Sequence, residues 1–226
     1  MDLIKWPFLK QSWGMEVVRS EGAYLYTKEG QKILDAAGGA IVSNIGYGRE
    51  EVAEAVKQAT KNNSYVLPPF LTPERESLLD ELREHWLPPH LTRIHLSSGG
   101  SEANESAVKL AIQYQASRGK PEKNIILTRT LSYHGTTLNM SGISGHAARK
   151  RGLESYVPKA PMIETPYPLR CPLGSFHPDA KDYYLNNLKE VIKKIGSENI
   201  AGLLMEPVNG SSGGAISPPE GYWEEA

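Results

Sequence analysis

The stretch His95–Gly119, HLSSGGSEANESAVKLAIQYQASRG, decides the fold class. It opens with a glycine–serine loop and continues as a helix candidate, with Gly119 and Pro121 in the places where a helix commonly ends. Short strands are predicted on either side of it, at Thr92–Leu96 and at Asn124–Thr128. A strand, a loop, a helix and a second strand in this order predict a right-handed crossover and a mainly parallel sheet.

The remaining segments extend this α/β pattern. Helices are predicted at Arg49–Lys61, at Pro73–Trp86 and at Tyr184–Ile195, because apolar residues recur on one face of each. The apolar run Ile200–Met205 is predicted to be a further buried strand. Alternation and turn residues at Glu16–Val42 predict short antiparallel strands before the parallel part of the chain.

The predicted sheet is incomplete. Only about three buried strands are visible, whereas a typical sheet has about 5–6. Ser155–Pro178, rich in proline, is expected to be a long surface connection. Met1–Gly14 carries three large aromatic residues without a clear period and is expected to be an arm that packs on its own domain or reaches a partner subunit.

Composition excludes several classes of protein. Among 226 residues, 39% are hydrophobic and 23% charged, which is ordinary for a globular protein and argues against disorder. A net charge of −1 argues against nucleic-acid and membrane partners. The single cysteine, Cys171, excludes an internal disulfide and a cysteine-rich zinc site. No signal peptide, transit peptide or membrane-spanning stretch is recognised, so a cytoplasmic location is expected.

The glycine loop is a candidate anion site. Gly99 and Gly100 let the backbone approach a ligand and adopt positive φ, and Ser101 offers a hydroxyl and an amide. Free amides and the dipole at a helix start favour a phosphate, and nearby acids favour one phosphate monoester over a polyphosphate. The alternative is that Ser101 is only an N-cap, with Glu102 and Glu105 complementing the helix dipole.

Two other strand ends are predicted to reach the same edge of the sheet. In LSYHGTT, Leu131–Thr137, Tyr133 can stack on a flat ligand and His134 can orient a group or transfer a proton. Glu206 directly follows the last apolar strand, where a carboxylate needs partners. The alternatives are ordinary packing for Tyr133, a hydrogen-bonded loop histidine, and a structural carboxylate. Together the three strand ends favour a phosphorylated, flat, aromatic ligand.

Other site types fit less well. No lysine follows the glycines as a P-loop requires. A hydrolase built on Ser132, His134 and Glu206 lacks the G-x-S-x-G elbow. Three evenly spaced histidines before the glycine loop do not share a helical face, because Pro88-Pro89 interrupts the segment, so no metal site is expected.

Several motifs in order resemble the class III pyridoxal-phosphate-dependent aminotransferases: SSGGSEANESAVKLA, SYHGTT with MSGISG, and MEPVNGSSGG with PPEGYW. The resemblance begins at about Val17. It implies an aspartate-aminotransferase-like α/β fold (PLP fold type I) and an active site shared across a homodimer. Residues 1–50 would then be an arm and the N-terminal part of the small domain, and residues 51–226 part of the large cofactor-binding domain.

The resemblance also implies the site and the reaction. Six residues would contact or adjoin pyridoxal 5′-phosphate: Gly99, Gly100, Ser101, Tyr133, His134 and Glu206. The first three would hold the phosphate and the tyrosine would stack on the pyridine ring. The glutamate would lie where substrate enters, with the histidine behind it. The reaction would move an amino group from an amine or amino acid to a keto acid.

Two groups that the family needs are not recognised here. These are the aspartate that pairs with the pyridine nitrogen and the lysine that forms the Schiff base, both expected beyond residue 226. Lys109 is expected to be a surface lysine two turns along the helix. No catalytic residue is therefore assigned, and the chain is expected to be the N-terminal part of a transaminase, inactive alone. The alternatives are a non-catalytic fragment or partner-binding module, and a decarboxylase or aminomutase of the same family.

Overall fold

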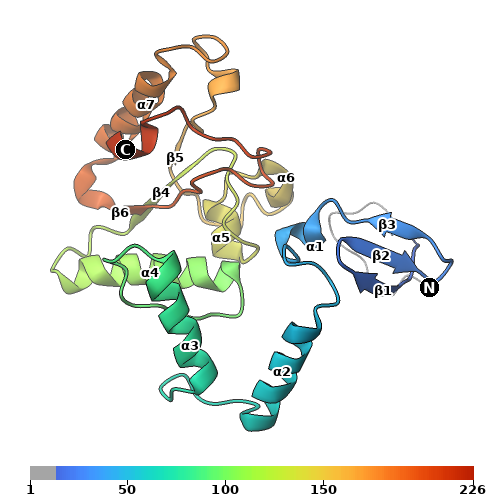
Figure 1. Ribbon diagram of the computed structural model, residues 1–226. Coiled ribbons are helices and arrows are strands. Elements are labelled where there is room, and N and C mark those ends of the chain that lie inside the picture. The colour runs from blue at the N-terminus through green and yellow to red at the C-terminus, as the bar shows by residue number, and fades with distance from the viewer. Residues whose placement is uncertain (1–13) are drawn as a thin grey trace. The chain divides into compact units, whose positions relative to one another are not determined.

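The computed structural model describes residues 14–226 (Figure 1). The predicted N-terminal arm lies, apart from Gly14, outside the described residues. The chain divides between Ile94 and His95 into two compact units, each described by itself. The sequence placed the boundary near residue 50, so the assignment of 51–94 to the large domain stays a prediction.

The first unit contains a three-stranded antiparallel sheet. Its strands are β1 (Val17–Glu21), β2 (Tyr24–Thr27) and β3 (Lys32–Leu34), in the order β1-β2-β3. The turns between them use Gly22 and Gly30, whose φ angles of 56° and 83° suit glycine. The prediction of short antiparallel strands is confirmed for this part.

The antiparallel pattern stops earlier than predicted. After β3 the chain forms the short element α1 (Gly38–Ile41), in which Gly39 and Ala40 have left-handed φ angles of 59° and 62°. The prediction that strands continue to Val42 was therefore wrong, because a run of left-handed residues cannot join a β-ladder.

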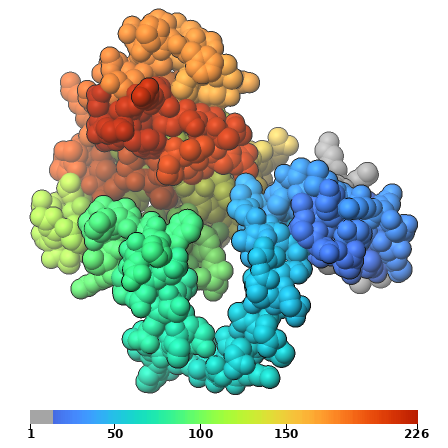
Figure 2. Space-filling model, viewed as in Figure 1, coloured from blue at the N-terminus to red at the C-terminus, as the bar shows by residue number. Residues whose placement is uncertain are grey.

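Two predicted helices of the first unit are confirmed. These are α2 (Glu50–Asn62) and α3 (Pro73–Glu81), which continues into a π-helical turn, η1 (Leu82–Trp86). Pro73 occupies the first turn of α3, and the hydroxyl of Thr72 caps it by accepting a 3.3 Å hydrogen bond from an amide. Neither α2 nor α3 buries a residue, and both lie at the surface in Figure 2.

The second unit is built on a parallel sheet. Its central strand β4 (Ile125–Arg129) pairs with β5 (Met162–Ile163) on one side and β6 (Ile200–Leu203) on the other. β4 is the most buried of the three strands. The prediction of a parallel α/β sheet is confirmed, and Figure 1 shows the three strands side by side.

Two strand predictions were wrong. Thr92–Leu96 is not a strand, since it pairs with no described segment and a strand exists only within a ladder. Ser155–Pro178 is not a simple surface connection, because it contributes β5 and the buried residues Ile163 and Cys171. Two-residue strands leave almost no periodic signal in a sequence, so β5 was missed.

Helices pack on this sheet and form the core. The long ones are α4 (Gly100–Ser117) and α7 (Ala180–Ile195), and α5 (Leu138–Ile143) is shorter. The remaining turns of helix are α6 (Ala147–Lys150), η2 (Pro168–Arg170), η3 (Ser197–Asn199) and α8 (Tyr222–Glu225). One core cluster joins α4, α5 and β4, and a second joins α7 to α8 and Cys171. Within residues 14–226, no helix has the length and apolar character needed to cross a membrane.

Candidate functional site

The glycines at the start of α4 leave open space. Gly99 has φ of −177°, which any residue adopts, so the predicted positive φ at Gly99 and Gly100 was wrong. A Cβ added at either position would meet no atom within 4 Å. Neither backbone strain nor packing within the described protein therefore requires glycine here. Because these two residues have no side chain, the space beside the N-terminus of the helix stays open, and a phosphate would fit there.

No side chain caps this helix start. Gly99 is the N-cap and makes no side-chain cap hydrogen bond, so the alternative of Ser101 as N-cap was wrong. The Ser101 hydroxyl oxygen instead accepts a 3.1 Å hydrogen bond from the amide of Thr136. Glu102 does lie in the first turn, as that alternative expected, and its Oε2 accepts a 2.9 Å hydrogen bond from the amide of Ser98. Glu105 instead accepts bonds from the side chains of Thr137 and Asn139. The N-cap itself carries no side chain, and the free amides at the start of an 18-residue helix favour an anionic ligand.

The start of α4 touches the loop that follows β4. A Cβ on Gly135, whose φ is 147°, would lie 2.7 Å from the hydroxyl oxygen of Ser101. The side chain of Asn104 donates a 2.7 Å hydrogen bond to the carbonyl of His134. Only glycine allows this approach, and the sequence reasoning named neither Gly135 nor Thr136 as a functional position. The sequence feature that could have identified these two residues is their position next to Tyr133 in the motif SYHGTT.

Tyr133 lies in the same loop and is half-buried. The guanidinium carbon of Arg149 lies 4.4 Å from the centre of its ring, which places a cation over one face. The backbone amide of Tyr133 donates a 3.1 Å hydrogen bond to Oε1 of Glu206. Two of the predicted site residues are therefore in direct contact.

His134 points into the interior rather than toward the helix start. It is 4% exposed, its Nε2 lies 2.9 Å from the hydroxyl of Thr128, and its amide donates to Ser144 at 2.8 Å. Burial lowers the pKa of the imidazole; the charge of Glu206 opposes this and that of Arg129 adds to it. A buried neutral imidazole with these partners fixes the loop, and such a role needs no contact with ligand.

Glu206 has a buried partner that the sequence reasoning missed. Nη2 of Arg129 lies 3.1 Å from Oε2 of Glu206; the Arg129 side chain has no exposed surface and that of Glu206 is 19% exposed. The available signal was an arginine that ends the apolar run IILTR, since a charge at the end of a buried strand requires compensation. The expected carboxylate with partners is present at this strand end.

The loop between β4 and Tyr133 has a strained turn. Leu131 has φ of 51°, a conformation that non-glycine residues rarely adopt. Its carbonyl accepts hydrogen bonds from the side chains of Asn209 and Ser212, both in the segment after β6. The ends of β4 and β6 are thereby tied together beyond the carboxyl edge of the sheet, where open parallel sheets bind ligands.

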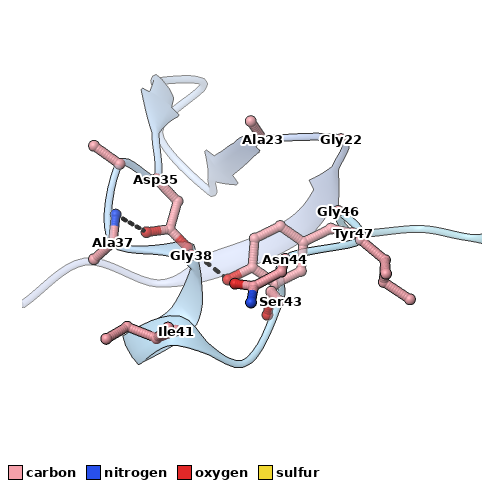
Figure 3. Close-up of a pocket in the computed structure, with 12 residues that line it drawn as sticks. Gly22, Ala23, Asp35, Ala37, Gly38, Ile41, Ser43, Asn44, Gly46 and Tyr47 are labelled. Carbon is pink, nitrogen blue, oxygen red and sulfur yellow. Dashed lines mark hydrogen bonds between the residues drawn. The ribbon is translucent and has the colours of Figure 1, made fainter. Parts of the chain in front are cut away.

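A separate hollow of about 610 Å³ lies within the first unit, beside α1. Figure 3 shows the carboxylate of Asp35 beside Ala37 and Tyr47. It accepts hydrogen bonds from the amides of Ala37 and Gly39, at 3.0 and 2.7 Å, and from the Tyr47 hydroxyl at 2.6 Å. These bonds, that of Tyr47 first, lower the pKa of Asp35. They hold the left-handed turn of α1, and the sequence reasoning did not single out this segment.

Two lysines of the second unit, Lys109 and Lys150, differ in their surroundings. Lys109 is exposed, as predicted. Lys150 is half-buried on α6, where burial lowers its pKa and its ammonium donates a 3.3 Å hydrogen bond to the carbonyl of Gly142. Within residues 14–226, no group of three or more histidine, cysteine, aspartate or glutamate side chains could hold a metal ion.

Known proteins match this chain over almost its whole length. A family model described as aminotransferase class-III matches residues 10–226. The uncharacterized aminotransferase YodT of Bacillus subtilis is 35% identical over 91% of this chain and 46% of the relative. The putrescine–pyruvate aminotransferase of Pseudomonas aeruginosa is 30% identical over 92% of this chain and 45% of the relative. The chain thus spans about half the length of the curated relatives it matches.

Solved structures of transaminases are also similar to this chain. An (S)-enantioselective omega-transaminase from Thermomicrobium roseum is 33% identical with a TM-score of 0.86, covering 93% of this chain and 47% of that one. A PLP-bound amine transaminase from an uncultivated Pseudomonas species is 27% identical with a TM-score of 0.90, covering 99% of this chain and 52% of that one. The predicted aspartate-aminotransferase-like fold is confirmed. Together with the family model, these matches show that the chain belongs to the class III aminotransferase family.

Proposed function

We propose that this chain is the N-terminal, phosphate-holding part of a pyridoxal-phosphate-dependent transaminase that moves an amino group from an amine or amino acid to a keto acid. One observation carries the proposal: the uncapped start of α4 and the space beside Gly99 and Gly100 lie next to the loop that bears Tyr133. A monophosphate on a flat ring fits this pairing of an anion site with an aromatic side chain.

Each residue then has a physical role. Amides at Gly100 and Ser101 hold the phosphate, and the Ser101 hydroxyl, which accepts from Thr136, keeps its own proton to donate. Tyr133 orients the ring by stacking. Glu206 lies beside the ring of the bound ligand, and His134 supports the loop of Tyr133 from the interior. When bound, the pyridoxal group supplies the electron sink for amino-group chemistry.

The catalytic lysine and the acid that pairs with the pyridine nitrogen belong, in this proposal, to polypeptide beyond residue 226. The relatives are about twice as long as this chain, which supports that division. The complete enzyme is proposed to be a cytoplasmic homodimer, and the chain alone is expected to show no turnover. A decarboxylase or aminomutase would use the same phosphate site, so these alternatives differ only in the substrate pocket.

Binding of pyridoxamine 5′-phosphate tests the phosphate site directly. This probe has no aldehyde, so it cannot form an imine with surface lysines such as Lys109. We expect its fluorescence to titrate with the chain, and pyridoxamine without phosphate to bind at least about tenfold more weakly, equivalent to about 1.4 kcal/mol. Equal binding of the two compounds would contradict the proposal.

The matched variants are Gly100→Asp at the start of α4 and Gln113→Asp at an exposed position farther along the same helix, so each adds one negative charge to α4. Aspartate at Gly100 complements the helix dipole, so folding is retained, but its charge opposes a phosphate. We expect at least about a tenfold loss of affinity for Gly100→Asp and none for Gln113→Asp. Binding that Gly100→Asp leaves intact would remove the phosphate assignment from this loop.

A further inference from the structure

Arg129 carries a charge that the fold has fully enclosed. It is the last residue of the central strand β4, and its side chain has no exposed surface. A guanidinium remains charged in proteins, and an unpaired buried charge is costly. Within residues 14–226, its Nε and Nη1 have no hydrogen-bond partner, so the contact of Nη2 with Glu206 is the main compensation.

The two oxygens of Glu206 have different partners. Oε2 accepts from Arg129 and Oε1 accepts from the amide of Tyr133, each at 3.1 Å. A carboxylate held at both oxygens has a single orientation. Without Arg129, Glu206 would keep only the amide and, being 19% exposed, could turn toward water. The arginine therefore determines which way the acceptor for Tyr133 points.

The loop needs that acceptor. Leu131 is in the left-handed region, with φ of 51°, and such a turn persists only where surrounding contacts impose it. Asn209 and Ser212 hold the carbonyl of Leu131, and Glu206 holds the amide of Tyr133 two residues later. Loss of the last contact leaves the Tyr133 amide without its acceptor, while Leu131 before it and His134 after it stay held.

We propose that Arg129 is a positioning residue: its buried guanidinium orients the Glu206 carboxylate, which holds the Tyr133 backbone so that the ring is preset for a flat phosphorylated ligand. The inference rests on the proposed function for the identity of that ligand. It assigns Arg129 no contact with ligand. Its effect is transmitted through two hydrogen bonds, which makes the route testable at each step.

The decisive measurement is a double-mutant cycle in the full 226-residue chain with pyridoxamine 5′-phosphate. Arg129→Met removes the charge but keeps an unbranched side chain, and we expect about a tenfold rise in Kd. In a Tyr133→Ala background the same change is expected to add nothing, because the ring that Arg129 positions is gone. An equal loss in both backgrounds would overturn the inference.

Two further variants separate positioning from folding. Arg129→Lys keeps the charge and is expected to recover part of the affinity, since its ammonium can still reach Glu206. Arg118→Met is the matched control, because Arg118 is exposed at the end of α4, with its guanidinium near the Tyr114 ring. It is expected to leave Kd unchanged. A loss for Arg118→Met equal to that for Arg129→Met would also overturn the inference.

A readout without ligand distinguishes this inference from the proposed function. In amide NMR spectra, Arg129→Met is expected to shift the Tyr133 resonance, whose hydrogen bond to Glu206 is weakened, and Arg118→Met is expected not to. Arg129→Met should also raise the pKa of His134, because the Arg129 charge lowers it. If the wild-type chain fails to bind the probe, the proposed function is contradicted and these shifts still decide the role of Arg129. An unchanged Tyr133 resonance would overturn that role.

Discussion

The two units of this chain differ in how far their apolar side chains are buried. Every buried hydrophobic residue of the described chain lies in the second unit, from Val108 to Tyr222. In the described part of the first unit only Thr27 is buried. The stripe predicted on α2 is present but uncovered, with Val52 and Val56 43% and 60% exposed. Amphipathic pattern alone thus does not show what a helix packs against.

Large apolar side chains of the first unit are exposed, including Phe70 and Trp86, at 62% and 73%. Large exposed apolar areas are typical of surfaces that other polypeptide covers.

The largest expected difference between the units is in the cost of deleting a leucine from a strand. Leu127 of β4 is 1% exposed, and Leu127→Ala is expected to lower the free energy of unfolding by about 3 kcal/mol. Leu34 of β3 is 58% exposed, and Leu34→Ala is expected to cost less than about 1 kcal/mol. Urea unfolding followed by circular dichroism measures both. Equal costs would break the comparison.

A smaller effect is expected from acid on the second unit. Because burial lowers the pKa of His134 below its usual 6.5, the unfolded chain binds the proton more readily. The stability that this group contributes is complete above pH 6.5 and is lost as the pH falls from there toward the folded-state pKa. His134→Gln is expected to flatten this part of the stability profile. Identical profiles for the variant and the wild type would contradict the burial of a neutral imidazole.

The smallest effect is expected in the first unit. The pKa of Asp35 is lowered from 3.8, so the stability it contributes is present above that pH and is lost as the pH falls through the folded-state pKa. Tyr47→Phe removes the largest cause and is expected to raise the pKa of Asp35 toward 3.8, with little change in global unfolding. Carboxyl carbon NMR measures the titration. A pKa unaffected by Tyr47→Phe would show that the amides of Ala37 and Gly39 suffice.

Long periodic segments were predictable, and unpaired or irregular ones were not. Helices α2 and α7 were expected within a few residues of their observed bounds, because a repeating apolar face extends over several turns. Helix α4 was expected from the glycine–serine loop before it and from Gly119 and Pro121 after it. The strand expected at Thr92–Leu96 has the composition but no ladder partner. Strand β5 does pair with β4, but its two residues are too few to show a periodic pattern in the sequence.

At the site, the sequence determined that Tyr133 and Glu206 follow the parallel strands β4 and β6, whose carboxyl ends lie at one edge of the sheet. It also placed the glycine–serine loop at the start of α4, although no strand precedes that loop among the described residues. Only the tertiary structure decided their contacts. It turned His134 inward, placed Ser101 against Thr136 instead of at the cap, and gave Glu206 its buried partner Arg129. Local sequence pattern indicates which residues follow a strand or begin a helix. The burial and hydrogen bonds of their side chains depend on residues far away in the sequence, because Arg129 and Glu206, for example, are 77 positions apart.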